Sequence, residues 1–149
     1  MADIVTPEKR SQMMAGIKGK NTKPEMLLRS ALHRLGFRYK LHGKGMPGKP
    51  DMVFPKYKAV IFIHCCFWHG HNCHLFKWPS SRPEFWETKI NRNREVDQRS
   101  IAKLESEGWR VGVVWECAVR GRAKLPFTDV IEIIGKWLQS SEPRIEIRG

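Results

Sequence analysis

The chain is poor in acidic residues and has no long apolar run. Only 15 of its 149 residues are Asp or Glu, against 27 Lys or Arg, so its formal net charge is +12. No segment approaches the roughly 20 consecutive apolar residues that a membrane span needs. The first residues also lack the basic-then-apolar pattern of a signal peptide. These absences argue against a membrane or secreted protein, and we expect a cytoplasmic one.

Cysteine is scarce as well, with four residues in the chain. In the cytoplasm thiols stay reduced, so these cysteines are interpreted as metal ligands or core residues before disulfides. Internal repeats and low-complexity tracts are lacking too, and the length suits one domain over residues 1–149. Within it we expect a basic arm over residues 1–20, a catalytic core over residues 21–140 and a tail over residues 141–149.

The basic charge is concentrated near the start of the chain. Residues 1–50 hold 11 basic and 3 acidic side chains. A polyanion is the expected partner, because basic side chains release condensed counterions when they bind one. The plainer alternative is that the charge serves solubility alone. Membrane association is disfavoured, because the basic segment lacks a long amphipathic apolar face.

Periodicity and capping patterns predict helices alternating with strands. Residues 22–25 and 81–84 match the capping box that starts a helix, and Gly36 and Gly108 follow the predicted helix ends. This order indicates an α/β protein with a mixed central sheet flanked by helices. The predicted helices span residues 7–17, 22–35, 81–107 and 128–139, and the predicted strands span residues 37–41, 52–54, 59–64 and 109–115. The helix over residues 22–35 has a wide apolar stripe of Met26, Leu27, Leu28, Ala31, Leu32 and Leu35.

The segment over residues 65–74 holds three cysteines, three histidines and two large aromatics. Structural zinc takes four nitrogen or sulfur ligands in a tetrahedron. Three local residues and one that follows the strand over residues 109–115 could supply them, namely Cys66, His71, Cys73 and Cys117. Cys65, His69 and His74 are rival ligands, and reduced core cysteines with incidental histidines are the alternative.

A second, harder metal site is predicted beside the first. Asp51 begins one strand, and His64 and His69 bracket the end of the next. Magnesium prefers oxygen ligands and keeps several waters, and a nearby histidine can take a proton from an attacking water. Glu25 could orient a metal-bound water, although its place in a capping box explains it equally well.

Exposed aromatic residues on a basic protein suit stacking between bases. Phe67 and Trp68 lie in a polar loop, and Trp86 follows Phe85 in the first turn of a helix. Adjacent helical residues point in different directions, so one of that pair is expected to be exposed. Ordinary core packing is expected for Phe85, Trp109 and Trp137, and Trp115 is left open.

Several of these segments together closely resemble the very-short-patch repair mismatch endonucleases of bacteria. The resemblance runs from about residue 10 to residue 137 and rests on residues 50–51, 60–69, 71–73, 84–86 and 113–121. It implies a variant of the restriction-endonuclease-like fold. It also implies a magnesium-dependent enzyme that nicks one DNA strand 5′ to the thymine of a T·G mispair left by deamination of 5-methylcytosine.

The resemblance also implies roles for single residues. Asp51 would hold two magnesium ions, with the backbone carbonyl of Ile63 as a further ligand. His69 would be the general base, with His64 and Glu25 assisting through metal-bound water. The structural zinc would be bound by Cys66, His71, Cys73 and Cys117.

DNA contacts follow from the same resemblance. Phe67, Trp68 and Trp86 would insert beside the mismatch, where a weakly stacked wobble pair lowers the cost of insertion. The N-terminal helix would grip the opposite, minor groove through Met14 and Ile17, although these residues could equally form a helix packing face. Duplex DNA with a T·G mispair is thus the expected partner of a monomer acting at the nucleoid, with mismatch-repair proteins as possible further partners.

The chain departs from the family at four positions. Ile63 stands where Thr is frequent, and Cys65 stands where Gly is usual. Gly70 and Asn72 interrupt a run that is richer in histidine in the family, which makes His69 a clearer candidate for the base. Two other functions remain open at this point. One is a restriction-type or structure-specific nuclease of the same fold, and the other is a non-catalytic zinc module that binds DNA by charge and stacking.

Overall fold

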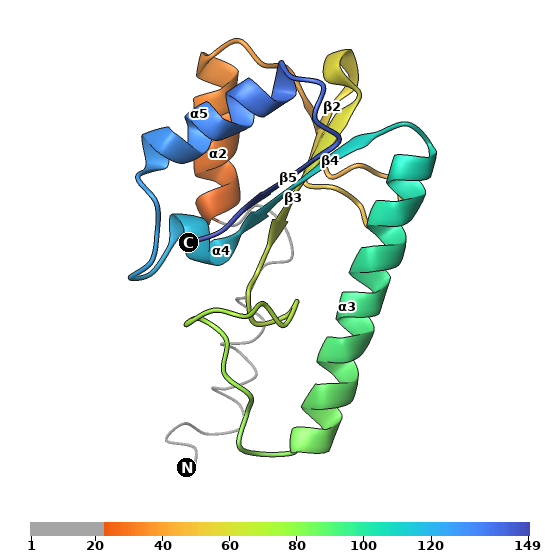
Figure 1. Cartoon of the computed structure of the whole chain (residues 1–149), viewed down its shortest axis with the longest axis vertical. Coiled ribbons are helices and arrows are strands. Elements are labelled where there is room, and N and C mark those ends of the chain that lie inside the picture. The colour runs from red at the N-terminus through yellow and green to blue at the C-terminus, as the bar shows by residue number, and fades with distance from the viewer. Residues whose placement is uncertain (1–22) are drawn as a thin grey trace.

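The computed structural model describes residues 23–149, so the predicted helix over residues 7–17, with Met14 and Ile17, lies outside the described residues. The described chain folds around one sheet of five strands (Figure 1). Its helices are α2 (Lys23–Arg34), α3 (Pro83–Ser106), α4 (Glu116–Val119) and α5 (Phe127–Leu138), with a 3-10 turn at Pro55–Tyr57. Its strands are β1 (Lys40–Leu41), β2 (Met52–Phe54), β3 (Ala59–His64), β4 (Arg110–Trp115) and β5 (Arg144–Ile147).

The sheet has the order β1-β2-β3-β4-β5, which confirms the predicted mixed α/β architecture. β1, β2 and β3 are antiparallel neighbours, whereas β3, β4 and β5 run parallel. The β3–β4 register ends by pairing His64 with Trp115. Residues that follow β3 and β4 therefore leave the sheet at the same edge, which brings the Cys/His segment close to Cys117.

One face of the sheet is covered by α2 and α5 (Figure 1). Leu28 and Leu32 of α2 pack with Ile134 and Leu138 of α5, and all four are almost completely buried. Trp137 is buried in the same core, as predicted. Burying a Leu or Ile side chain contributes about 1.5–3 kcal/mol, so this face supplies most of the apolar stabilisation.

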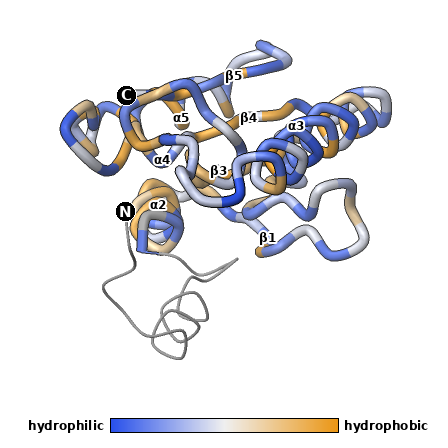
Figure 2. The backbone as a smooth tube through the Cα atoms, turned by 90° about the horizontal axis from the view of Figure 1, so that it is seen from below, coloured by the Kyte–Doolittle hydropathy of each residue, from blue (hydrophilic) through white to orange (hydrophobic). Residues whose placement is uncertain are grey.

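The opposite face is covered by α3, which contributes much less. Ile90 and Leu104 are its buried residues, and Leu104 packs against Val60 and Val111. Figure 2 shows hydrophobic colour along β4 and mostly hydrophilic colour along α3. The helix is therefore polar over most of its surface. Among the described residues, no helix has the length and apolar character needed to cross a membrane.

The structure corrects two strand predictions. The strand expected over residues 37–41 is reduced to Lys40–Leu41, because Phe37 is 7% exposed and packs in the core near Gly135 of α5. No strand was expected after residue 141, yet β5 (Arg144–Ile147) pairs with β4 there. The strands over residues 52–54 and 59–64 are confirmed.

Three helix predictions are also corrected. α3 begins at Pro83 with Arg82 as its N-cap in a left-handed conformation, and no side chain caps it, so the capping box at Ser81 is wrong. Half of the expected apolar stripe of α2 faces solvent, because only one narrow side of the helix meets the sheet. Its exposed members are Met26, Leu27 and Leu35. The expected burial of Phe85 is wrong too, since 45% of it is exposed.

Candidate functional site

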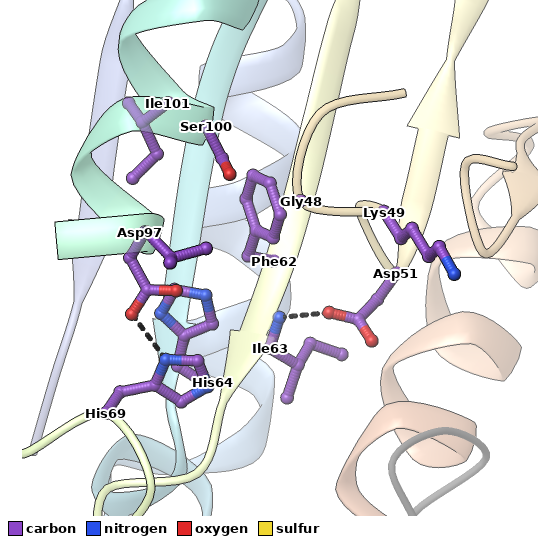
Figure 3. Close-up of a pocket in the computed structure, with 11 residues that line it drawn as sticks. Gly48, Lys49, Asp51, Phe62, Ile63, His64, His69, Asp97, Ser100 and Ile101 are labelled. Carbon is purple, nitrogen blue, oxygen red and sulfur yellow. Dashed lines mark hydrogen bonds and ion pairs between the residues drawn. The ribbon is translucent and has the colours of Figure 1, made fainter. Parts of the chain in front are cut away.

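A pocket of about 200 Å³ opens beside the C-terminal end of β3. Asp51 enters it from the start of β2, and Ile63 and His64 enter it from β3 (Figure 3). His69 reaches it from the loop after β3, and Asp97 reaches it from α3. Four parts of the chain thus place two carboxylates and two imidazoles around one cavity.

Asp51 is fixed to the strand beside it. Its Oδ2 accepts a hydrogen bond of 2.6 Å from the backbone N–H of Ile63 (Figure 3). Burial raises the pKa of Asp51 from an ordinary 3.8 to about 7, the Ile63 N–H opposes this shift, and the nearby Glu25 carboxylate adds to it. A cation would favour the charged form of this carboxylate, so the site fits a metal that takes oxygen ligands.

The two predicted histidines lie face to face. The rings of His64 and His69 stack with centroids 3.9 Å apart and an interplanar angle of 7°. Burial, reinforced by the neighbouring His69, lowers the pKa of His64 to about 3, so His64 is neutral at physiological pH. Its Nδ1 is buried without a hydrogen-bond partner in the described part of the chain. A neutral imidazole of this kind places no positive charge beside His69.

His69 is oriented by a residue that the sequence analysis missed. Its Nδ1 lies 2.5 Å from Oδ2 of Asp97 (Figure 3). With the proton on Nδ1, His69 donates to Asp97 and keeps Nε2 as a proton acceptor. Asp97 lies 28 residues away on a polar helix, so local spacing gave no indication of this pair. The sequence offered one indication of Asp97, which is that acidic residues are scarce in this chain and each is therefore a candidate for a specific role.

Glu25 lies on the other side of Asp51. It is 1% exposed in the first turn of α2, and its Oε1 is 3.6 Å from Nδ1 of His42. Carboxylate and imidazole atoms of Glu25, His42 and Asp51 all lie within 4.8 Å of one another. The structure therefore brings the predicted Glu25 to Asp51, and it adds His42, which the sequence analysis did not single out.

A separate cluster of thiols forms where β3 and β4 end. Ligand atoms of the four predicted zinc residues lie within 4.8 Å of one another, in Cys66, His71, Cys73 and Cys117. Nδ1 of His71 is 3.5 Å from Sγ of Cys66 and 3.5 Å from Sγ of Cys117. Nε2 of His71 is buried without a hydrogen-bond partner among the described residues. Three sulfurs and one nitrogen at this separation fit a closed tetrahedral site, and zinc is the ion that such sites usually hold.

The electrostatics of these thiols favour the same interpretation. Burial raises the pKa of Cys66, and the adjacent thiols of Cys73 and Cys117 raise it further. Without a cation, burial of this kind would keep the Cys66 sulfur protonated, whereas a bound metal deprotonates its thiol ligands. Among the rival ligands, Cys65 instead hydrogen-bonds Glu116 and His69 binds Asp97.

The predicted aromatic residues form one cluster beside the pocket. The ring centroid of Phe67 lies 5.2 Å from that of Trp68 and 5.4 Å from that of Trp86. The ring centroids of the two tryptophans are 5.8 Å apart. Asn93 donates a hydrogen bond of 2.8 Å to the carbonyl of Trp68 and so ties the loop to α3. Trp115, left open by the sequence, stacks on His71 with centroids 3.9 Å apart and supports the thiol cluster.

The chain is similar in sequence to known nicking endonucleases. The sequence model of DNA mismatch endonuclease Vsr matches residues 2–75. The chain is 42% identical to DNA mismatch endonuclease Vsr of Escherichia coli K12, over 100% of this chain and 97% of that protein. It is 50% identical to the type II nicking enzyme V.XorIIP of Xanthomonas oryzae, over 78% of this chain and 86% of that one. It is 48% identical to the type II nicking enzyme V.NmeAIP of Neisseria meningitidis, over 83% of this chain and 88% of that one. Together with the pocket and the thiol cluster, these similarities show that the chain belongs to the Vsr family of DNA mismatch endonucleases.

Proposed function

We propose that the protein nicks one strand of duplex DNA on the 5′ side of the thymine of a T·G mispair. The observation that carries this proposal is the pocket in which Asp51, bonded to the N–H of Ile63, faces the His69–Asp97 pair. A carboxylate for a metal and an oriented base are what hydrolysis of a phosphodiester needs. The printed name of the E. coli relative supports mismatched DNA as the substrate. The fold is proposed to be restriction-endonuclease-like.

The chemistry of the pocket residues divides into two roles. His69, held through Nδ1 by Asp97, takes the proton of the attacking water at Nε2. His64 stacks on His69 and is kept neutral by burial, so it adds no positive charge that would oppose protonation of the base. Both histidines lie on the side of the pocket opposite Asp51 (Figure 3), which leaves the phosphate a place between them.

Magnesium is the proposed catalytic metal, and Asp51 and the backbone carbonyl of Ile63 are its proposed protein ligands. We propose that two magnesium ions bind there. When bound, it would stabilise charge on the phosphate and lower the pKa of the attacking water. Glu25 lies close to Asp51 and is placed to accept a hydrogen bond from a water at the metal. Ile63 contributes through its backbone, which explains why an aliphatic side chain is acceptable there.

Zinc is the proposed structural metal at Cys66, His71, Cys73 and Cys117. These residues join the loop after β3 to α4 after β4, so zinc would hold the end of β3 and hence the pocket in place. A closed four-ligand site contributes to folding and leaves no open position for chemistry. The extra thiol Cys65 is assigned no role in metal binding, because it bonds Glu116.

The aromatic cluster is the proposed wedge for the mismatch. Phe67 and Trp68 directly precede His69 of the pocket and pack with Trp86, and Nζ of Lys89 lies 6.0 Å from the ring of Trp68, where it can meet a phosphate. Unstacking a base step costs a few kcal/mol, and a wobble pair lowers that cost. A minor-groove grip through Met14 and Ile17, action as a monomer in the cytoplasm and cooperation with mismatch-repair proteins stay predictions of the sequence.

The test is strand-specific nicking of a duplex with one T·G pair beside its C·G twin, with and without Mg²⁺. Wild type is compared with Asp51→Asn, His69→Gln and the control His33→Gln, a change at an exposed histidine at the end of α2. We expect a nick 5′ to the mismatched thymine that needs Mg²⁺, survives in the control and is lost in the other two variants.

Two other results would point elsewhere. Equal cutting of both duplexes would indicate a general nuclease of the same fold. Binding without cutting, over several flanking sequences, would indicate a zinc module that holds DNA by charge and stacking.

A further inference from the structure

The proposed chemistry gives no role to His42, although its imidazole lies at the metal pocket. Nδ1 of His42 is 3.6 Å from Oε1 of Glu25, and both side chains belong with Asp51 to a group whose ligand atoms lie within 4.8 Å. The three residues come from the turn after β1, from α2 and from the start of β2. Because these three side chains belong to different elements, they come together only in the folded chain.

The backbone holds His42 opposite Asp51. The β1–β2 register pairs Leu41 with Met52, and the next pair in that register is His42 with Asp51. The N–H of His42 donates a hydrogen bond of 3.0 Å to the carbonyl of Asp51. His42 also adopts a φ of 55°, a left-handed conformation that is uncommon for residues other than glycine. Such conformations concentrate at ligand sites, where the surrounding structure enforces them.

Two acidic side chains lie beside the imidazole of His42. Glu25 is 1% exposed, and the neighbouring Asp51 is partly buried. Two carboxylates that share a partly desolvated site repel each other unless a positive charge lies between them. An imidazole beside them can serve in two ways, as a protonated partner of Glu25 or as a neutral ligand of a metal that neutralises both carboxylates.

We propose that His42 is a metal ligand, so that His42 and Asp51, with Glu25 beside them, form a mixed carboxylate–imidazole site that prefers Mn²⁺ to Mg²⁺. This inference rests on the proposed function to the extent that Asp51 binds the catalytic metal. Mg²⁺ takes oxygen ligands in near-ideal octahedral geometry, so a nitrogen ligand disfavours it. Ions of the first transition row accept imidazole readily. The nitrogen of His42 therefore makes this site select a different ion from an all-oxygen site.

The experiment uses the full zinc-loaded chain and Mn²⁺ alone as the probe. Mn²⁺ leaves zinc in a thiolate site, because soft thiolates select zinc. Free Mn²⁺ is counted by its electron paramagnetic resonance signal, and Mg²⁺ affinity is obtained by competition. Spin-echo modulation from ¹⁴N reports whether a nitrogen is bound to the Mn²⁺. The variants are His42→Gln and the control His33→Gln, with circular dichroism as the check that both are folded.

In wild type and His33→Gln we expect one Mn²⁺ site with ¹⁴N modulation. In His42→Gln we expect Mn²⁺ affinity to fall by about tenfold or more, the modulation to vanish, and Mg²⁺ affinity to change much less. An unchanged Mn²⁺ affinity or a surviving modulation in His42→Gln would overturn the proposal, and so would a wild type that binds no Mn²⁺.

Nicking assays separate this inference from the proposed function. If wild type nicks T·G duplex with Mg²⁺ and His42→Gln binds Mn²⁺ normally, His42 is only the ion-pair partner of Glu25 and the proposed function stands. If wild type nicks no mismatched duplex with either ion, the proposed function fails, whatever the Mn²⁺ titration shows. Loss of the ¹⁴N modulation in His69→Gln but not in His42→Gln would assign the nitrogen to the base and also overturn the inference.

Discussion

Replacing Asp51 by asparagine is expected to stabilise the metal-free protein while it removes nicking. The Asp51 carboxylate lies close to Glu25 and accepts a hydrogen bond of 2.6 Å from the N–H of Ile63. An asparagine side chain has the same shape, and its oxygen can still accept that hydrogen bond. The substitution therefore removes a poorly solvated negative charge and little else.

The magnitude follows from the pKa of Asp51, which rises from an ordinary 3.8 to about 7 on folding. At 1.36 kcal/mol for each pH unit, this difference corresponds to at most about 4 kcal/mol, and solvent access to the half-buried side chain lowers the expected value to about 2 kcal/mol. The folded state holds the proton more tightly, so the wild type is not penalised below pH 3.8. Its stability falls as pH rises from about 4 to about 7, and the full penalty applies above pH 7.

The assay is denaturant unfolding of zinc-loaded wild type and Asp51→Asn between pH 5 and 8.5, with and without Mg²⁺. We expect the variant to be more stable by about 2 kcal/mol at pH 8.5 and by clearly less at pH 5. Mg²⁺ should stabilise the wild type and not the variant, because only the wild-type carboxylate gains a cation. Glu95→Gln, a change at an exposed carboxylate on α3, is the control and should show no such trend.

The reasoning would be refuted if Asp51→Asn were less stable than wild type at pH 8.5. A difference between the two proteins that did not change with pH would refute it as well. In either case the carboxylate would be well compensated in the metal-free fold, and Asp51 would have no electrostatic need for a cation.

Three further predictions concern the other parts of the site. Asp97→Asn should slow single-turnover nicking by about 10²-fold or more without weakening DNA binding, because His69 loses the partner of its Nδ1; an unchanged rate would remove the pair from the mechanism. Cys117→Ser should lower bound zinc, counted by atomic absorption, and should lower the unfolding midpoint; a full zinc content with normal stability would contradict the proposed ligand set. Trp68→Ala should weaken binding to T·G duplex by about 1–3 kcal/mol in fluorescence anisotropy, with a smaller effect on matched duplex; equal losses on both would make Trp68 a structural residue.

The sequence was most informative where local pattern and tertiary position coincide. An uninterrupted apolar run predicted β3 over residues 59–64, and the structure confirms those bounds. The predicted ligands Cys66, His71 and Cys73 are close in sequence, so the loop alone gathers them, and Cys117 joins because parallel strands end at one edge. Metal binding by this cluster stays a prediction.

Features that depend on distant packing could not be predicted in this way. Asp97 meets His69 because of where α3 crosses the sheet, and His42 meets Glu25 because of how β1 pairs with β2. β5 is short and alternates charged with apolar residues, and β4 supplies the partner that makes it a strand. In each case the contact joins residues that are far apart in sequence, so a local sequence pattern cannot predict it.

The polar character of α3 also divides the molecule into parts of unequal stability. Its first half is held by few contacts, among them bonds from Asn93 to the carbonyl of Trp68 and from Arg94 to the carbonyl of Gly70. Segments with few buried apolar contacts open locally at a lower free energy than the core. Trp86 and Asp97, the partner of the base His69, therefore lie on a helix that can detach while β3, β4 and α5 stay folded. On warming, the enzyme should lose its ability to cut before it loses its sheet.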